Sequence, residues 1–305
     1  MEKHRKKLIK NAAVFDGHSS GLAQGKKIVI EDDIVTEITA DEVSEENFDE
    51  VFDGTGMVAM PGMTDAHVHM GCLFAKGEFP VDYATVLTVA KCKDALMAGF
   101  TTFRDAGSVS EGLKLAFDEG VLPGPRIYPC GAYISQTCGH GDSEYAHTYR
   151  DIQYRHPSSP VLADGVPEII RAVREQFYRG ASHIKLTATE ILNRHEDIRL
   201  LFGTDMMITG PDYQVEQSED IRYYEKRFGT MRALRALTGT ANEVFALTTY
   251  QNPYPKGKIG VLEAGAFADL LLVDGDPTKS VSVLADTDHL RLIMKGGTVY
   301  KNTLC

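Results

Sequence analysis

The chain has 305 residues, of which 43% are apolar, so it is long enough for one large α/β domain or two smaller domains with a buried core. Its net charge of −11, without a basic stripe interleaved with aromatic residues, argues against nucleic acid as a partner. No run reaches the roughly 18 to 20 apolar residues that cross a bilayer, and the basic lead MEKHRKKLIK lacks the apolar run of a signal peptide. We therefore expect a cytoplasmic protein without a membrane partner, and its five cysteines, none in a C-x-x-C pair, fit free thiols in a reducing compartment.

The two ends of the chain share one sequence pattern. Between residues 7 and 60, short runs rich in Val and Ile alternate with turn-forming pairs such as Asp-Gly, which predicts a small β-domain. Similar runs return after Pro255, between residues 258 and 301. We expect residues 1–60 and 240–305 to pack together as one composite β-sandwich domain; two unrelated β-extensions are the alternative.

The middle of the chain, residues 61–239, alternates short apolar strands with helical segments. The expected strands are Met63–Met70, Thr101–Asp105, Arg126–Ser135, His183–Ala188 and Arg199–Asp205. Helices are expected over residues 82–98 and 167–179, each ended by a glycine, with Asp164 as a candidate cap of the second. Such alternation predicts an α/β fold, a parallel sheet or TIM-like (β/α)-barrel, with functional side chains at the C-terminal ends of the strands.

The stretch TDAHVHMG places His67 and His69 two residues apart on the first of these strands. Side chains two apart on a strand point the same way, so the two imidazoles can converge on one divalent metal ion. The alternative is a pair of ordinary polar residues at a strand end. The rest of the chain has to decide between these interpretations.

Lys185 and Asp205 lie at the ends of two later strands. A lysine in the apolar strand HIKLTA must pair, lose its proton or be chemically altered, because a buried unpaired charge is costly. Reaction of its neutral amine with carbon dioxide would give a carbamate whose two oxygens can bridge two metal ions; a salt bridge to a neighbouring carboxylate is the alternative. Asp205 can ligate a metal and accept the proton of bound water. Arg104 and Asp105 are expected to form a structural ion pair rather than to be catalytic.

Several motifs in order, PGMTDAHVHMG, TTFRDAG, GHGD, HIKLTAT, FGTD and the tail GVLEAGAFADLLLVDGDP, resemble the metal-dependent amidohydrolase superfamily. The chain looks most like the imidazolonepropionase-related branch, with its prolidase-like and carboxypeptidase-like enzymes. This resemblance implies a (β/α)-barrel with a composite β-sandwich and one or two divalent metal ions, usually zinc. It implies that His67 and His69 hold the metal and that carboxylated Lys185 bridges the metal ions. It also implies that Asp205 is a ligand and general base, and that His140 faces the substrate.

The family pattern fails at one place. It has two further histidines, at the ends of the fifth and sixth strands, and three strand–helix units between the lysine strand and the aspartate strand. Three such units need on the order of 100 residues, far more than lie between Ala188 and Arg199. His195 is the only histidine there. It lies in a polar segment that leads to the aspartate strand, and it is not expected as a ligand. Either an internal segment is absent between about residues 189 and 198, which the undisturbed order of the other motifs favours, or the chain has lost part of its barrel and cannot close it.

We predict a metal-dependent hydrolase of amide (C–N) bonds that uses metal-activated water on a small N-acyl amino acid or dipeptide-like substrate. A cyclic amidohydrolase or deaminase of the same superfamily is one alternative, since fold does not fix function. A non-catalytic amidohydrolase-like assembly protein is the other. The missing histidines leave open that this chain alone is inactive, and a homo-oligomer is compatible with the sequence.

Overall fold

The computed structural model describes residues 5–70, 81–107, 111–139, 141–142, 160–187, 199–207 and 213–304, and the structural statements below concern this part of the chain. Its strands are β1 (Lys6–Lys10), β2 (Ala13–Val14), β3 (Lys27–Glu31), β4 (Ile34–Thr39), β5 (Glu50–Asp53), β6 (Val58–Pro61), β7 (Met63–His69), β8 (Phe100–Asp105), β9 (Arg126–Tyr128), β10 (Ile134–Ser135), β11 (Val161–Leu162), β12 (Leu186–Thr187), β13 (Met206–Met207), β14 (Leu270–Val273), β15 (Leu290–Lys295) and β16 (Thr298–Asn302). Its helices are α1 (Val81–Met97), α2 (Glu111–Asp118), α3 (Gly165–Tyr178), α4 (Tyr213–Phe228), α5 (Thr230–Leu237) and α6 (Gly239–Phe245), with short 3-10 turns that include η5 (Val281–Ala285). None of the described helices is long and apolar enough to cross a membrane.

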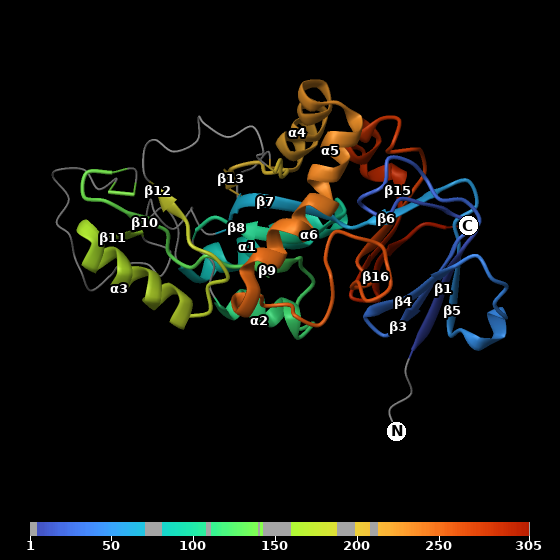
Figure 1. The fold of residues 1–305 in the computed structure, drawn as a ribbon, viewed down its shortest axis with the longest axis horizontal. Helices are drawn as coiled ribbons and strands as arrows, with labels where there is room; N and C mark the ends of the chain where they lie inside the picture. The colour runs from blue at the N-terminus through green and yellow to red at the C-terminus, as the bar shows by residue number, and fades with distance from the viewer. Residues whose placement is uncertain are drawn as a thin grey trace.

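Two sheets lie at one end of the molecule (Figure 1). The first has the strand order β4-β3-β1-β5 and comes from the N-terminal segment. The second, of order β16-β15-β14-β6-β2, contains strands from both ends of the chain, because β6 pairs antiparallel with β14. One buried cluster includes Ile28 and Ile30 of the first sheet and Leu272 and Leu292 of the second. The two ends of the chain therefore contribute to one core, while their description as a separate sandwich domain stays a prediction.

Strand β14 separates two cores. Successive side chains of a strand point to opposite faces, so a strand buried on both faces needs a continuous apolar run. Leu270 and Leu272 belong to the cluster between the two sheets, whereas Leu271 and Val273 belong to the cluster beneath the α/β region. The run LLLV is therefore explained by burial on both sides.

A single glycine joins the β-rich end to the parallel strands. The Gly62 N–H donates to Asp269 O at 2.9 Å, while the next N–H, of Met63, donates to Gly99 O at 3.0 Å, so the chain changes sheets within one residue. A Cβ added at Gly62 would lie 2.2 Å from Thr101 Oγ1. Only a residue without a side chain fits this close crossing.

The described parallel strands form two short sheets, of order β13-β7-β8-β9 and β11-β10-β12. The first brings the last parallel strand in the chain, β13, beside the first, β7. A barrel places its last strand beside its first in this way, whereas an open sheet would need a connection across its whole width. The sequence predicted a barrel that lacks about three strand–helix units, and neither described sheet closes.

Strand boundaries near the C-terminal edge differ from the prediction. The expected strand Arg199–Asp205 is irregular, and β13 begins only at Met206. This segment still runs beside β7, with Ala66 N–H donating to Phe202 O and Asp205 N–H to His67 O, both at 2.8 Å. Asp205 has a left-handed φ of 55°, which is incompatible with a regular strand. The expected strand Arg126–Ser135 is likewise divided into β9 and β10.

Helices α1 and α3 form close to their expected positions. Gly99 and Gly180 follow them with φ of 88° and 96°, the conformation that ends helices. The capping prediction for Asp164 was wrong in detail: this residue occupies the cap position, but its carboxylate accepts hydrogen bonds from Thr137 N and Oγ1 instead. A contact distant in sequence has replaced the local one.

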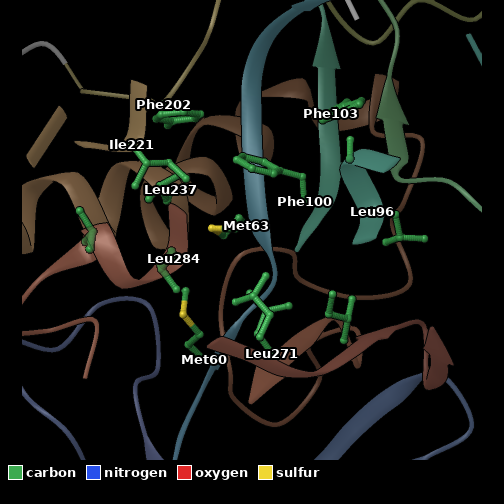
Figure 2. Close-up of a cluster of buried hydrophobic side chains, with 14 of the residues drawn as sticks. Met60, Met63, Leu96, Phe100, Phe103, Phe202, Ile221, Leu237, Leu271 and Leu284 are labelled. Carbon is green, nitrogen blue, oxygen red and sulfur yellow. The ribbon is translucent and has the colours of Figure 1, made fainter. Parts of the chain in front are cut away.

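The core beneath β7 extends across both regions (Figure 2). Met60 and Leu271, from the β-rich end, belong to the same buried cluster as Met63, Phe100 and Phe202. Strand β7 is thus supported from below by side chains of the second sheet. The position of its C-terminal end, where the histidines lie, depends on this packing.

Candidate metal centre

Strand β7 presents both histidines to one site. His67 and His69 lie two residues apart in it, and their ring centroids are 5.4 Å apart. Together with Asp205 they form a group whose ligand atoms all lie within 4.8 Å of one another. The convergence expected from the two-residue spacing is therefore present, and it includes a carboxylate from much later in the chain.

One carboxylate oxygen lies between the two imidazoles. Asp205 Oδ1 is 3.0 Å from His67 Nε2 and 3.1 Å from His69 Nε2. Metal–ligand bonds of about 2.0 to 2.2 Å at tetrahedral angles place ligand atoms roughly 3.3 Å apart, close to these separations. The Asp205 side chain is 72% exposed, so the group is open on the side away from the strand.

Lys185, the residue immediately before β12, approaches the same group. Its Nζ lies 2.9 Å from His67 Nε2. Within the described residues no carboxylate lies within ion-pair distance of this Nζ, so the salt bridge considered as an alternative is not observed there. The three segments that carry these side chains are β7, the approach to β12 and the approach to β13.

The environment of His67 keeps its imidazole neutral. Burial lowers the pKa of His67 to about 4, and the charge of Lys185 acts in the same direction. A neutral Nε2 has one proton or one lone pair, so it cannot both accept from Lys185 and donate to Asp205. A cation between His67, His69 and Asp205 would satisfy these electron-rich atoms together, and two imidazoles with a carboxylate are a ligand set that suits zinc. The residues present therefore fit a divalent metal ion.

The local backbone brings Asp205 against β7. A Cβ added at Gly203 would lie 2.7 Å from the Cβ of His67, so glycine permits the close approach of the two segments. The left-handed φ of Asp205 then turns its carboxylate toward the histidines. Asp is among the residues that tolerate this conformation.

Arg104 and Asp105 do not pair with each other. Neighbours on a strand face opposite ways. Arg104 Nη1 donates to Ala66 O at 3.2 Å, whereas the Asp105 carboxylate accepts from the N–H groups of Met70 and Gly107. The expected ion pair between them was therefore wrong, because the pleat separates the two side chains.

His140, the predicted substrate contact, and His195, which was not expected as a ligand, lie outside the described residues, as does the stretch 188–198. The sequence prediction also missed Asp65, Thr204 and Gln217, which surround the backbone of the candidate centre. A signal for Asp65 was available, because it precedes His67 by two residues on the same strand and so shares its face. No sequence signal pointed to Gln217, which comes from α4.

The amidohydrolase family model matches residues 58–197, which include β7, the approach to β12 and three of the four converging side chains. This part of the chain is similar to the amidohydrolase family. The fourth converging side chain, Asp205, lies beyond the matched residues.

Among curated proteins, this chain is similar to an ochratoxinase of Aspergillus niger, with 34% identity over 152 residues. The match covers 43% of this chain and 31% of that protein, so it spans less than a third of the relative's length. Sequence identity at this level over part of a protein supports common ancestry of that part.

Three solved structures extend the likeness to the whole fold. A crystal structure of an amidohydrolase has a TM-score of 0.84 at 23% identity, over 98% of this chain and 100% of that chain. A prolidase complexed with N-methylphosphonate-L-proline has a TM-score of 0.82 at 22% identity, over 97% and 100%. The Aspergillus niger ochratoxinase structure has a TM-score of 0.78 at 19% identity, over 99% and 96%. These neighbours imply a TIM-barrel-like α/β fold for this chain.

Proposed function

We propose that this protein is a metal-dependent hydrolase of an amide bond in a small N-acyl amino acid or dipeptide-like substrate. The observation that carries the proposal is the convergence of His67, His69, Asp205 and Lys185 from three separate segments on one open group. A structural cluster has no evident need for these ligand types at an exposed strand end.

His67, His69 and Asp205 would hold the metal ion, which we propose is zinc. When bound, such an ion lowers the pKa of water toward neutrality and polarises a carbonyl oxygen. Lys185 would join this set as a carbamate, formed when its neutral amine attacks carbon dioxide and a proton leaves to solvent. One or two ions would then be held, according to whether this carbamate forms.

Asp205 is the proposed general base. Its carboxylate is 72% exposed, so a substrate and a water molecule can reach it while Oδ1 still contacts both histidines. Asp205 would take the proton from water and deliver it to the leaving amine nitrogen. The neutral imidazole of His67 cannot supply that proton near pH 7, because its pKa is about 4.

The substrate class rests on the relatives. The prolidase structure contains N-methylphosphonate-L-proline, an N-substituted amino acid, and an ochratoxinase shares the matched part of this chain. His140, at the end of the third strand, is the proposed contact to the substrate. A cyclic amide or a deamination substrate would use the same metal chemistry and remains the alternative that an assay has to exclude.

We further propose that a segment of about three strand–helix units, with two histidines, is absent between about residues 189 and 198. The strand order β13-β7-β8-β9 supports this, since it is the order left when such units are removed from a barrel. The complete protein would then be the cytoplasmic enzyme, and this chain alone would hold a metal through an incomplete ligand set.

Metal content tests the proposal. We expect elemental mass spectrometry on exhaustively desalted protein to show about one zinc-like ion per chain, and the double variant His67→Ala/His69→Ala to show none. Assay of loaded protein against N-acyl amino acids and dipeptides should then show hydrolysis, with cyclic amides and aminopurines as comparison substrates. Metal-free protein that was never exposed to chelator would overturn the proposal and favour the non-catalytic assembly protein.

A further inference from the structure

A buried carboxylate lies directly behind the candidate metal centre. Asp65, on β7, has no exposed surface. Its Oδ1 accepts from the N–H groups of His67 and Thr204, at 3.2 and 3.3 Å. Its Oδ2 accepts from Thr204 Oγ1 at 2.9 Å and from Gln217 Nε2 at 3.4 Å. The carboxylate thus has four donors, and none of them is a cationic side chain.

Three of the four donors belong to two of the three segments that carry the converging side chains. His67 lies on β7 itself, and Thr204 immediately precedes Asp205. The third partner, Gln217, fixes the carboxylate from α4. One side chain therefore links the backbone of a histidine to the backbone next to the carboxylate that meets it.

The segment that carries Asp205 needs such a link. Asp205 is largely exposed, has a left-handed φ and lies outside any regular strand, so its side-chain position is not fixed by packing. Its backbone is tied to β7 through Asp205 N–H to His67 O at 2.8 Å. Beside the contacts of the Asp205 carboxylate with the two histidines, the two bonds from Thr204 to Asp65 anchor this segment to β7.

We propose that Asp65 is a positioning residue that acts through Thr204 to hold Asp205 Oδ1 between the two imidazoles. The proposal rests on the proposed function, because it concerns how the chain shapes the same metal site. Asp65 itself touches neither metal nor substrate.

Two variants separate positioning from simple structural support. Thr204→Val removes the hydroxyl donor but keeps the branched shape, whereas Thr204→Ser keeps the hydroxyl and loses a methyl group. If Thr204 only supports the fold, metal affinity should change in parallel with packing and the free energy of unfolding of each variant. If it positions Asp205, metal affinity should depend on whether the hydroxyl is present.

The experiment titrates Co²⁺ alone into the metal-free full chain and records both the dissociation constant and the visible absorption band of bound Co²⁺. Outer contacts of this kind typically change metal affinity about 10- to 100-fold. We expect Thr204→Val to weaken Co²⁺ binding by about that factor and to shift the band, and Thr204→Ser to restore both. Glu225→Gln is the stability control. Glu225 lies in another part of α4, and its carboxylate accepts hydrogen bonds from Ser280, Ser282 and Thr230. This variant should lower the melting temperature and leave the Co²⁺ band unchanged.

The outcomes are distinguishable. If the unaltered chain binds no Co²⁺, the proposed metal site fails and takes this inference with it. If the unaltered chain binds Co²⁺ and Thr204→Val binds it equally well with the same band, only the positioning role is overturned. Should Thr204→Val not fold, Thr204→Ala removes the same hydroxyl without introducing a new methyl group at the Oγ1 position, and the same two readouts decide.

Discussion

The β-rich end and the α/β region of this protein differ in how completely their sheets are built. In the second sheet, β14, β15 and β16 have four, six and five residues and pair antiparallel, with one register shift in each pairing. In the α/β region, β7, β8 and β9 pair parallel, and neither described sheet closes. An antiparallel sheet is complete with neighbouring strands, whereas a barrel needs every unit to close. The described sheets of the two regions therefore differ in what they need to be complete.

This difference also bears on the candidate site. The two histidines of the candidate centre, His67 and His69, lie on strand β7, above a core shared with the second sheet. Lys185 and Asp205 lie on irregular segments just before β12 and β13. We therefore infer that the histidine half of the site is rigid and that the other half depends on the specific contacts of Asp65 and Thr204.

The largest expected effect comes from completing the barrel. We would build a chimera in which residues 188–198 are replaced by a designed segment of about three strand–helix units that carries two histidines at strand ends. Structural zinc sites bind with about 10 to 16 kcal/mol for four ligands, roughly 3 kcal/mol or 100-fold per ligand. A gain of that order in zinc affinity is expected for each histidine restored, measured by calorimetric titration. A chimera that folds but binds zinc no more tightly would contradict the proposed missing segment.

The second prediction uses the two faces of β14. Leu271→Ala and Leu272→Ala should each lower the free energy of unfolding by about 2 to 5 kcal/mol, because both side chains are fully buried. Only Leu271 belongs to the cluster beneath β7. We expect Leu271→Ala to weaken Co²⁺ binding as well, with Leu272→Ala as the matched control. Equal Co²⁺ affinity in the two variants would show that the core beneath β7 does not position the histidines.

The third prediction concerns the pH dependence of stability at the junction of the two regions. Burial lowers the pKa of Lys295 to about 8, although its Nζ donates to Gly124 O at 2.5 Å. Between pH 8 and the unfolded value of 10.5 the unfolded chain binds more protons, so stability should rise with pH across this window. Below pH 8 both states carry the charge, and the burial cost of up to about 3 kcal/mol is fully present. Urea unfolding from pH 7 to 10.5 should show this rise, and Lys295→Met should flatten it; an identical slope in the variant would contradict the assignment.

The smallest effect is expected on the outside of α3. Arg179 and Glu175 form an exposed ion pair one helical turn apart. Glu175→Gln should change the free energy of unfolding by less than about 0.5 kcal/mol. Thermal melts at low and high salt would check this. A larger change would mean that surface charge, and not the missing strands, limits the stability of the α/β region.

Much of the fold could be predicted from local sequence patterns. The runs of Val and Ile at both ends, the helices ended by Gly99 and Gly180, and the strands β7 and β8 all follow from periodicity and backbone preference. The predicted details of helix ends and strand boundaries were wrong where a contact with a residue distant in sequence determines the local structure. The Asp164 carboxylate accepts a hydrogen bond from Thr137 instead of capping its helix. The left-handed φ of Asp205 is incompatible with a regular strand, so β13 begins only at Met206.

For the candidate site, the sequence by itself determined that His67 and His69 face one way, because the pleat of a strand fixes which side chains share a face. It also predicted a lysine and an aspartate at the ends of later strands, whereas in the structure Lys185 and Asp205 lie just before β12 and β13. Only the tertiary structure decided that Asp205 Oδ1 lies between the two imidazoles and that Lys185 Nζ reaches His67. It alone showed Asp65 behind them, tied to Thr204 and Gln217. Residues more than a hundred positions apart meet through the order of parallel strands and through packing. No local stretch of the chain determines either of these.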